Sequence, residues 1–166
     1  MADRDTQAAA TALLDLCKAK KLMLATAESC TGGGVAQAIT EVAGSSAWFE
    51  RGFVTYSNRS KQQMLGVNES TLMQHGAVSE ATAREMVTGA LQHSEAQVAL
   101  AVSGIAGPDG GTPDKPVGTV WVAVAGPDDR VDSRRINWPG ARDQVRALSS
   151  WTALAMVLRA LRGGEV

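Results

Sequence analysis

Cysteine is scarce in this sequence, and its scarcity indicates a compartment. Cys17 and Cys30 are the only two cysteines among 166 residues. Two thiols cannot build the disulfide framework typical of small secreted proteins, so we expect a reducing compartment, the cytoplasm. The charged start of the chain leads into no apolar signal core. The longest apolar run, residues 153–158, is much shorter than the roughly 20 residues that span a bilayer, so we expect no membrane contact.

An excess of positive charge and a supply of aromatic side chains are missing as well. The formal net charge is −1, from 16 Lys and Arg against 17 Asp and Glu residues, and aromatic residues make up 4% of the chain. Proteins that bind nucleic acid present a basic surface with stacking side chains, so we expect no nucleic-acid partner. One basic cluster late in the chain could hold a phosphate group, and it consists of Arg134, Arg135, Arg142 and Arg146.

Helical and strand patterns alternate along the chain. Helices are predicted over residues 9–17, 35–39, 59–65, 83–91 and 151–161. Ser79 is a candidate N-cap for the fourth of these helices, and Gly163-Gly164 follows the last one. Strands are predicted over residues 22–26, 53–56, 98–102 and 117–125, with a weaker fifth over 131–138.

The order of these elements predicts the fold class. The runs 22–26 and 98–102 are nearly continuously apolar, as strands covered on both faces are. Only residues 126–129 separate the last two strands, which predicts a hairpin and therefore an antiparallel pair. We expect an α/β fold in a single domain over residues 1–166, a three-layer α/β/α sandwich around a mixed, mostly parallel sheet of about five strands.

Three segments rich in glycine and hydroxyl side chains follow predicted strands and mark the expected site. They are residues 28–34, 56–58 and 103–108. Ligands of open α/β sheets bind beyond the carboxyl ends of the strands. The glycines at 32–34 let the backbone approach a ligand, although no Gly-Lys follows as it does in a P-loop. A tight strand-to-helix turn without a ligand would also explain them.

Ser29 and Cys30 are the candidate nucleophiles at the first of these turns. The two histidines, His75 and His93, lie in or beside helical segments, and the sequence has no Gly-x-Ser-x-Gly elbow. No cluster of His, Cys and carboxylate residues has metal-ligand spacing, so no metal is expected. A buried cysteine often has only a packing role, which favours Ser29 as the nucleophile.

A serine without a histidine needs another base, and two residues of the second turn could serve. Tyr56 is the only tyrosine and ends a predicted strand, and Lys61 follows it five residues later. An ammonium could stabilise a phenolate, or a neutral lysine could take the serine proton directly. A tyrosine hydroxyl in water and a solvated lysine are the alternative interpretation of the same pair.

Five motifs in order run through nearly the whole chain. They are AESCTGG at 27–33, GSSAWFERGFVTYSN at 44–58, HGAVS at 75–79, SGIAGPDGG at 103–111 and KPVGTV at 115–120. This series resembles the CinA C-terminal domain family, whose active members are nicotinamide-nucleotide amidohydrolases of the PncC type. The resemblance implies hydrolysis of the carboxamide of nicotinamide mononucleotide to nicotinate mononucleotide and ammonia, in pyridine nucleotide salvage and without a cofactor.

The resemblance also assigns roles to residues. It implies a serine nucleophile, matching Ser29, with Tyr56 and Lys61 as its catalytic partners. It implies a substrate site lined by Thr31, Gly32, Gly33, Ser103, Gly104 and Arg142. Our hypothesis is acyl transfer in two steps through a serine ester, with Tyr56 beside Lys61 as the proton acceptor and with amides of residues 31–34 holding the oxyanion.

One position departs from the family pattern. The chain has Gly140-Ala141-Arg142 where the family pattern has Gly-Asp-Arg, which puts the setting of Arg142 in doubt. This departure keeps open the alternative of an inactive module that binds a pyridine nucleotide. An accessory protein of competence or DNA repair, suggested only by the name of the family, and an amidase for free nicotinamide are two further alternatives. We expect the stand-alone form of the domain, and a homodimer because two-fold assemblies are common.

Overall fold

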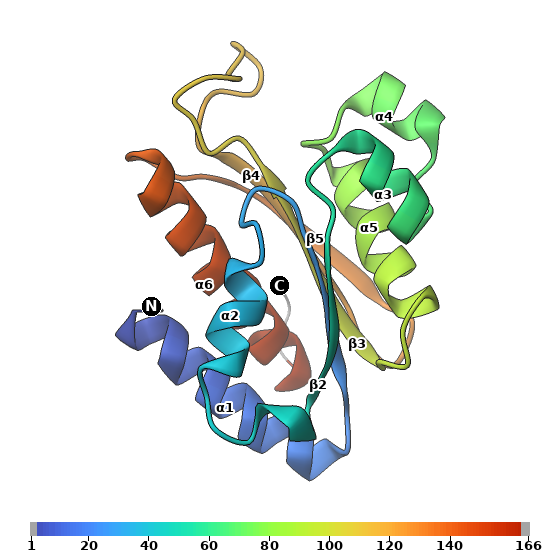
Figure 1. Ribbon diagram of the computed structural model, residues 1–166, viewed down its shortest axis with the longest axis vertical. Helices are drawn as coiled ribbons and strands as arrows, with labels where there is room; N and C mark the ends of the chain where they lie inside the picture. Colours follow the sequence, from blue (N-terminus) through green and yellow to red (C-terminus); the bar gives the residue numbers. More distant parts are fainter. Residues whose placement is uncertain (1–2, 164–166) are drawn as a thin grey trace.

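A five-stranded sheet lies between two layers of helices in the computed structural model, which describes residues 3–163 (Figure 1). In sheet order the strands are β2, β1, β3, β4 and β5. Their bounds are β1 (Leu24–Glu28), β2 (Phe49–Val54), β3 (Val98–Gly104), β4 (Thr119–Ala125) and β5 (Val131–Asn137).

Strand direction confirms the mixed sheet. β1 pairs in parallel with β2 and β3, whereas β4 pairs antiparallel with β3 and with β5. Four strands therefore run in one direction and β4 alone runs against them. The predicted hairpin is confirmed as the β4–β5 pair. The carboxyl ends of β1, β2 and β3 meet at the same edge of the sheet, where ligands of such folds bind.

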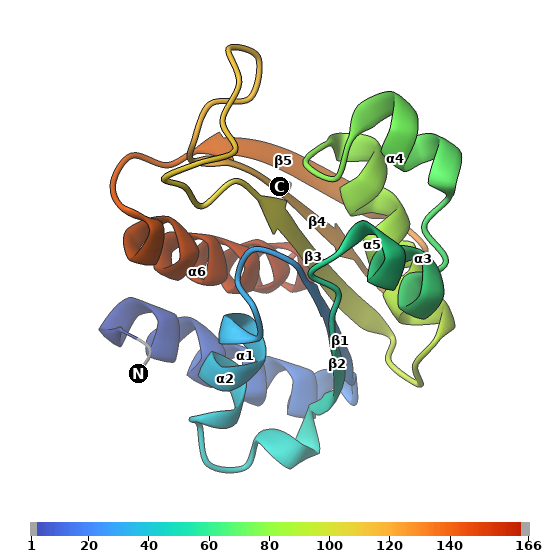
Figure 2. The same ribbon diagram turned by 45° about the horizontal axis from the view of Figure 1, so that its top comes forward.

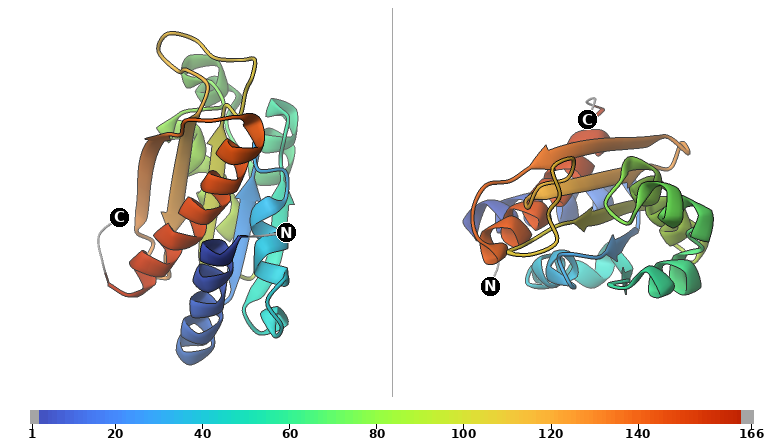
Figure 3. Two further views of the ribbon diagram at one scale, coloured as in Figure 1. Left: turned by 90° about the vertical axis from the view of Figure 1, so that its left-hand side faces the viewer. Right: turned by 90° about the horizontal axis from the view of Figure 1, so that it is seen from above.

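Helices lie on both faces of the sheet, as Figures 2 and 3 show from further sides. On one face lie α1 (Arg4–Lys20), α2 (Gly34–Thr40) and α6 (Arg142–Leu161), and a 3-10 turn (Ser45–Ala47) joins α2 to β2. On the other face α5 (Glu80–Gln92) packs on the strands, and α3 (Asn58–Leu65) and α4 (Glu69–His75) pack on α5. This arrangement confirms the α/β/α sandwich. No helix of the described part is long and apolar enough to cross a membrane.

The two faces of the sheet carry side chains of different size. The face toward α6 presents larger buried side chains, among them Leu24, Leu100 and Val122. The buried apolar strand residues on the face toward α5 are alanines, namely Ala25, Ala27, Ala99, Ala101, Ala123 and Ala125, and the partly buried Phe53, Trp121 and Val131 pack against them. Since successive side chains of a strand point to opposite faces, the alternation of Val or Leu with Ala along β3 and β4 produces this difference. The alanine face allows α5 to lie close to the strands.

Element bounds differ from the prediction in several places. β1 and β2 are displaced from the predicted 22–26 and 53–56, so Thr55 and Tyr56 lie beyond the end of β2. Helix α4 was not predicted, because Leu72 is its only buried residue and its N-cap makes no side-chain hydrogen bond. Helix α6 begins nine residues before the predicted 151, since its first turns are largely polar. The predicted stop at Gly163 follows the end of α6, and Gly164 lies outside the described residues.

The contact between α3 and α5 depends on Gly89. A Cβ atom at this position would lie 1.9 Å from the carbonyl oxygen of Leu65. We predict that Gly89→Ala lowers the free energy of unfolding by about 1–3 kcal/mol, because overpacking outweighs the gain of about 1 kcal/mol in helix propensity. Urea denaturation measures this loss.

The matched control is Gly126→Ala, whose Cβ would meet only the exposed Asp128 side chain at 3.1 Å. It should change the free energy of unfolding by less than about 0.5 kcal/mol. Equal effects of the two substitutions would contradict the steric explanation.

Candidate active site

Ser29 is the first residue beyond the end of β1, and the sheet places it directly. Its backbone N–H donates to the carbonyl of Val102 in β3, at 2.9 Å, which anchors the turn to the neighbouring strand. The turn then reverses through Gly32 and Gly33, whose φ angles of +60° and +100° favour glycine. Helix α2 begins at the next residue. This geometry holds the Ser29 side chain at the carboxyl edge of the sheet.

Lys61 reaches Ser29 from the other helical layer. The Lys61 side chain is fully buried, and its Nζ lies 2.9 Å from Ser29 Oγ and 2.7 Å from the carbonyl oxygen of Thr55. A weaker contact of 3.4 Å joins Nζ to the carbonyl oxygen of Tyr56. The start of α3 directs the side chain there, because Ser57 caps the helix by accepting the N–H of Ser60.

Burial changes the chemistry of this lysine. Loss of hydration lowers the pKa of Lys61 from its usual 10.5 to about 8. No ion pair joins Lys61 to a carboxylate within residues 3–163, so nothing of that kind stabilises its charged form there. A substantial fraction of the amine is therefore neutral near physiological pH, and a neutral amine beside a hydroxyl can accept its proton.

Tyr56 takes a different position from the one predicted for a proton acceptor. Its side chain is 63% exposed, and its hydroxyl accepts a hydrogen bond from Arg142 Nη2 at 3.2 Å. Arg142 Nη1 donates to the carbonyl of Gly107 at 2.8 Å. Among the described residues no hydrogen bond joins the Tyr56 hydroxyl to Ser29. Tyr56 and Arg142 thus form a bridge between the end of β2 and the β3–β4 loop.

A pocket of about 230 Å³ opens beside Ser29. Six of the nine predicted site residues line it, and these are Ser29, Tyr56, Lys61, Ser103, Gly104 and Arg142. The rest of the lining comes from Cys30, Ala77, Val78 and Ala106. Ser103 ties two of these segments together, because its hydroxyl donates to the carbonyl of Ala77 at 2.8 Å. The strands and turns that the sequence suggested therefore meet at one pocket.

The other three predicted site residues do not line this pocket. The hydroxyl of Thr31 donates to the Glu28 carboxylate. Of the amides expected to hold the oxyanion, those of Gly32 and Gly34 already donate to the carbonyls of Ser29 and Thr31, at 3.0 and 2.9 Å. Gly33 shares the turn. These residues give the turn its shape, and they are not among the residues that line the pocket.

Glu28 supports the turn that follows the nucleophile in the chain, and sequence reasoning missed it. Its carboxylate is fully buried and accepts the backbone N–H groups of Val35 and Ala36, at 2.9 and 3.1 Å, together with the Thr31 hydroxyl. A carboxylate at the start of a helix is stabilised by the exposed N–H groups there. The sequence did contain one signal, which was an acidic residue at the end of a largely apolar strand. A carboxylate buried in such a place needs hydrogen-bond donors around it.

The competing nucleophile and the histidines can now be placed. Cys30 lines the pocket, but burial raises the pKa of its thiol to about 11, so the reactive thiolate is rare at neutral pH. Neither His75 nor His93 lines the pocket, and a ring nitrogen of His93 contacts the carbonyl of Gly89 at 2.8 Å. No group of three or more His, Cys, Asp and Glu residues in the described part could hold a metal ion.

The basic cluster divides in the structure. Arg142 reaches the pocket, whereas Arg135 lies on β5 and donates to the carbonyl of Asp114 at 2.8 Å. Ala141 is the N-cap of α6 and makes no side-chain capping bond, although its N–H donates to Gln144 Oε1 at 2.9 Å. An aspartate there could accept an N–H group of the first helical turn. The departure at this position thus affects helix capping, and Arg142 still reaches the site.

Comparison with known proteins bears on this site. The sequence model of the CinA C-terminal domain matches residues 6–161. The chain belongs to the CinA C-terminal domain family. It is 58% identical over 137 residues to the nicotinamide-nucleotide amidohydrolase PncC of Escherichia coli, a match that covers 82% of this chain and 83% of that protein.

Longer proteins and solved structures also match. A putative competence-damage inducible protein of Symbiobacterium thermophilum is 56% identical over 150 residues, which cover 86% of this chain and 35% of that protein. The crystal structure of the competence/damage inducible protein CihA from Agrobacterium tumefaciens superposes with a TM-score of 0.95 and 44% identity, covering 98% of both chains.

The buried amine makes stability depend on pH. The pKa of Lys61 is about 8 in the folded chain and 10.5 when unperturbed, so the unfolded chain binds more protons between these values. The contribution of Lys61 to the free energy of unfolding is fully present above its unfolded pKa of 10.5, and it is lost as the pH falls through about 8. Relative to Lys61→Met, wild type should therefore gain up to about 3 kcal/mol in free energy of unfolding as pH rises from neutral through this window.

Urea denaturation at several pH values measures the difference between the two chains. Lys18→Met, which removes an exposed lysine of α1, is the matched control. If the difference in free energy of unfolding between wild type and Lys61→Met stays constant with pH, the lowered pKa of Lys61 is contradicted.

Proposed function

We propose that this chain hydrolyses the carboxamide of nicotinamide mononucleotide to nicotinate mononucleotide and ammonia. The observation that carries the proposal is the 2.9 Å contact between the buried Lys61 Nζ and Ser29 Oγ at the wall of a pocket. A serine hydroxyl beside a neutral amine is an activated nucleophile of the kind that can attack an amide carbonyl. The identity of the amide follows from the relatives named nicotinamide-nucleotide amidohydrolase.

The proposed reaction proceeds through a serine ester. Neutral Lys61 accepts the Ser29 proton while Oγ attacks the carboxamide carbon, and the resulting ammonium of Lys61 then protonates the amide nitrogen. The C–N bond breaks and ammonia leaves. In the second half a water molecule attacks the ester, Lys61 accepts a proton from that water, and the proton returns to Ser29 Oγ as nicotinate mononucleotide departs. The positive charge of the pyridinium ring withdraws electrons from the carbonyl and favours both attacks.

The geometry favours Lys61 over Tyr56 as the immediate proton acceptor. Lys61 Nζ contacts Ser29 Oγ, whereas the Tyr56 hydroxyl contacts Arg142 at the rim of the pocket. A general base must be within hydrogen-bond reach of the proton that it takes. We assign Tyr56 to the wall that borders the substrate, with its hydroxyl orienting the Arg142 guanidinium.

The dimensions of the pocket support a substrate that is only partly enclosed. Its volume of about 230 Å³ is smaller than the roughly 300–1,000 Å³ of pockets that enclose drug-sized ligands. We propose that the nicotinamide ring enters and that the ribose phosphate remains at the rim, where Arg142 can donate to the phosphate. The same proposal includes a cytoplasmic location, a role in pyridine nucleotide salvage and a homodimer. The two free, buried cysteines support the cytoplasmic location, because disulfides are rare there.

Removal of the nucleophile tests the proposal. Ser29→Ala should lower ammonia release from nicotinamide mononucleotide at least roughly 1,000-fold while the circular dichroism spectrum stays unchanged. Ser70→Ala, an exposed serine of α4, is the control and should keep wild-type turnover. An active Ser29→Ala chain would exclude the serine ester, and a wild type that binds the nucleotide without releasing ammonia would support a binding module instead. Higher kcat/KM for free nicotinamide than for the mononucleotide would exclude the substrate assignment.

The pH dependence of the rate tests the base. Because only neutral Lys61 accepts the proton, kcat/KM should rise with pH and level off above about 8, the pKa of Lys61. Lys61→Arg keeps the positive charge but cannot deprotonate in this range, so it should be inactive at every pH. Stopped assays of ammonia over a series of buffers measure both profiles. A wild-type profile without this rise would remove Lys61 from the proton transfer.

A further inference from the structure

Arg146 contacts the turn that carries Ser29, and it does not line the pocket beside Ser29. It follows Arg142 by four residues on α6, so the two arginines occupy successive turns of one helix face. Arg142 reaches the substrate pocket, whereas Arg146 Nε donates to the carbonyl of Cys30 at 3.1 Å and Nη2 donates to the carbonyl of Thr31 at 3.3 Å. These two carbonyls belong to the residues directly after the nucleophile.

Several features show that the guanidinium is fitted to this turn. A Cβ atom at Gly32 would lie 3.2 Å from Arg146 Nη2, so the guanidinium packs against the open side of that glycine. No ion pair involves Arg146 within residues 3–163, and its side-chain hydrogen bonds there go to the two backbone carbonyls. On another side of the same turn the Glu28 carboxylate accepts the Thr31 hydroxyl. The turn is therefore held between a guanidinium and a carboxylate.

Two bonds to consecutive carbonyls restrict the orientation of two peptide planes. A peptide plane is rigid, so a bound carbonyl also determines the direction of the amide on the opposite side of the plane. Rotation of either plane would move Ser29, whose carbonyl accepts the N–H of Gly32 at 3.0 Å within the same turn. We propose that Arg146 is a positioning residue of the hydrolase: it holds the backbone so that Ser29 Oγ stays in contact with Lys61, without touching substrate. This inference rests on the proposed function.

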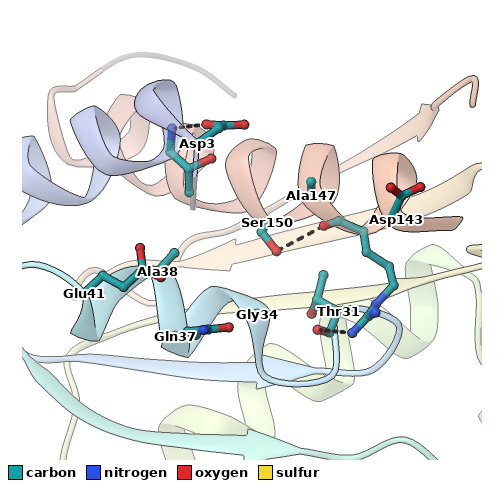
Figure 4. A pocket seen from close by; sticks show the side chains of 11 residues that line it. Asp3, Thr31, Gly34, Gln37, Ala38, Glu41, Asp143, Ala147 and Ser150 are labelled. Carbon is teal, nitrogen blue, oxygen red and sulfur yellow. Dashed lines mark hydrogen bonds between the residues drawn. The ribbon is translucent and has the colours of Figure 1, made fainter. Parts of the chain in front are cut away.

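The planar guanidinium of arginine is suited to donating to two neighbouring carbonyls at once, and the ammonium of lysine is not. A guanidinium presents several N–H donors in fixed directions, whereas an ammonium is a compact point donor on a flexible stem. A second pocket of about 350 Å³, lined by Arg146, Thr31, Gly34 and Ser150 among others, lies between α2 and α6 (Figure 4). The dashed line at Thr31 in Figure 4 marks the hydrogen bond from Arg146. A small cation from solution could thus occupy the place of a truncated Arg146 side chain.

The test combines truncation, a conservative replacement and chemical rescue. Arg146→Ala should lower kcat for nicotinamide mononucleotide about 100-fold with KM changed by less than about threefold, because misplacing a reacting group by about 1 Å costs a factor of this size. Millimolar guanidinium chloride should restore part of kcat in Arg146→Ala, without stimulating wild type or Ser29→Ala. Arg146→Lys should remain impaired. Arg159→Ala, an exposed arginine further along α6, is the control and should match wild type.

The other outcomes overturn either the positioning role alone or the proposed function together with it. An active wild type together with an equally active Arg146→Ala would overturn the positioning role alone. A rise in KM with unchanged kcat would show that Arg146 binds substrate, and full activity of Arg146→Lys would show that only its charge matters, so either result overturns the inference. A wild type that releases no ammonia would overturn the proposed function and this inference with it. Thermal unfolding of each variant identifies losses of activity that are caused by misfolding. If Arg146→Ala is folded and guanidinium chloride does not restore any of its kcat, the positioning role is overturned.

Discussion

The burial of one amine determines most of what this site can do. Lys61 gives up hydration to reach Ser29, and that loss is what lowers its pKa toward neutrality. A solvated lysine at the same distance would stay protonated and could not accept the serine proton. The fold compensates with the carbonyls of Thr55 and Tyr56, which accept hydrogen bonds from the amine without the charge of a carboxylate. A carboxylate partner would favour the protonated form and raise the pKa again.

The sheet and the helices contribute different parts of the site. Parallel strands bring Ser29 after β1 and Tyr56 after β2 to one edge, and β3 supplies Ser103 and Gly104 there. Helix α3 adds the amine from one layer, and α6 adds guanidinium groups from the other. The chemistry is therefore assembled across all three layers of the sandwich. The assignment to the CinA C-terminal domain family agrees with this arrangement, since the match extends over residues 6–161 and includes every one of these elements.

The sequence predicted the elements with strong periodicity and much of the pocket. The rule that ligands bind beyond strand ends is enough to group Ser29, Tyr56 and Ser103 from the amino-acid sequence alone. The burial of Lys61 could not be predicted, because its helix is polar and its neighbours in the chain indicate a solvated helix; the contacts that cover it come from distant segments. The contacts of Arg146 could not be predicted either, because its partners are backbone carbonyls that leave no pattern in the sequence. Glu28 left one signal, an acidic residue at the end of a largely apolar strand, but its partners could not be named from the sequence. Helix α4 was missed because only Leu72 is buried in it.

The alanine face of the sheet has a consequence for the chemistry at a distance. Lys61 and Leu65 lie one turn apart on α3, and both are buried. The Leu65 carbonyl lies against Gly89 of α5, and other residues of α5 pack on the alanines of the sheet. Any change that separates these two helices would admit water to the amine and restore its hydration. Its affinity for a proton would then rise, and under the proposed mechanism turnover at neutral pH would slow without any substitution at the pocket. Under that mechanism, the packing of α3 against α5 and the rate of hydrolysis are coupled through the hydration of a single side chain.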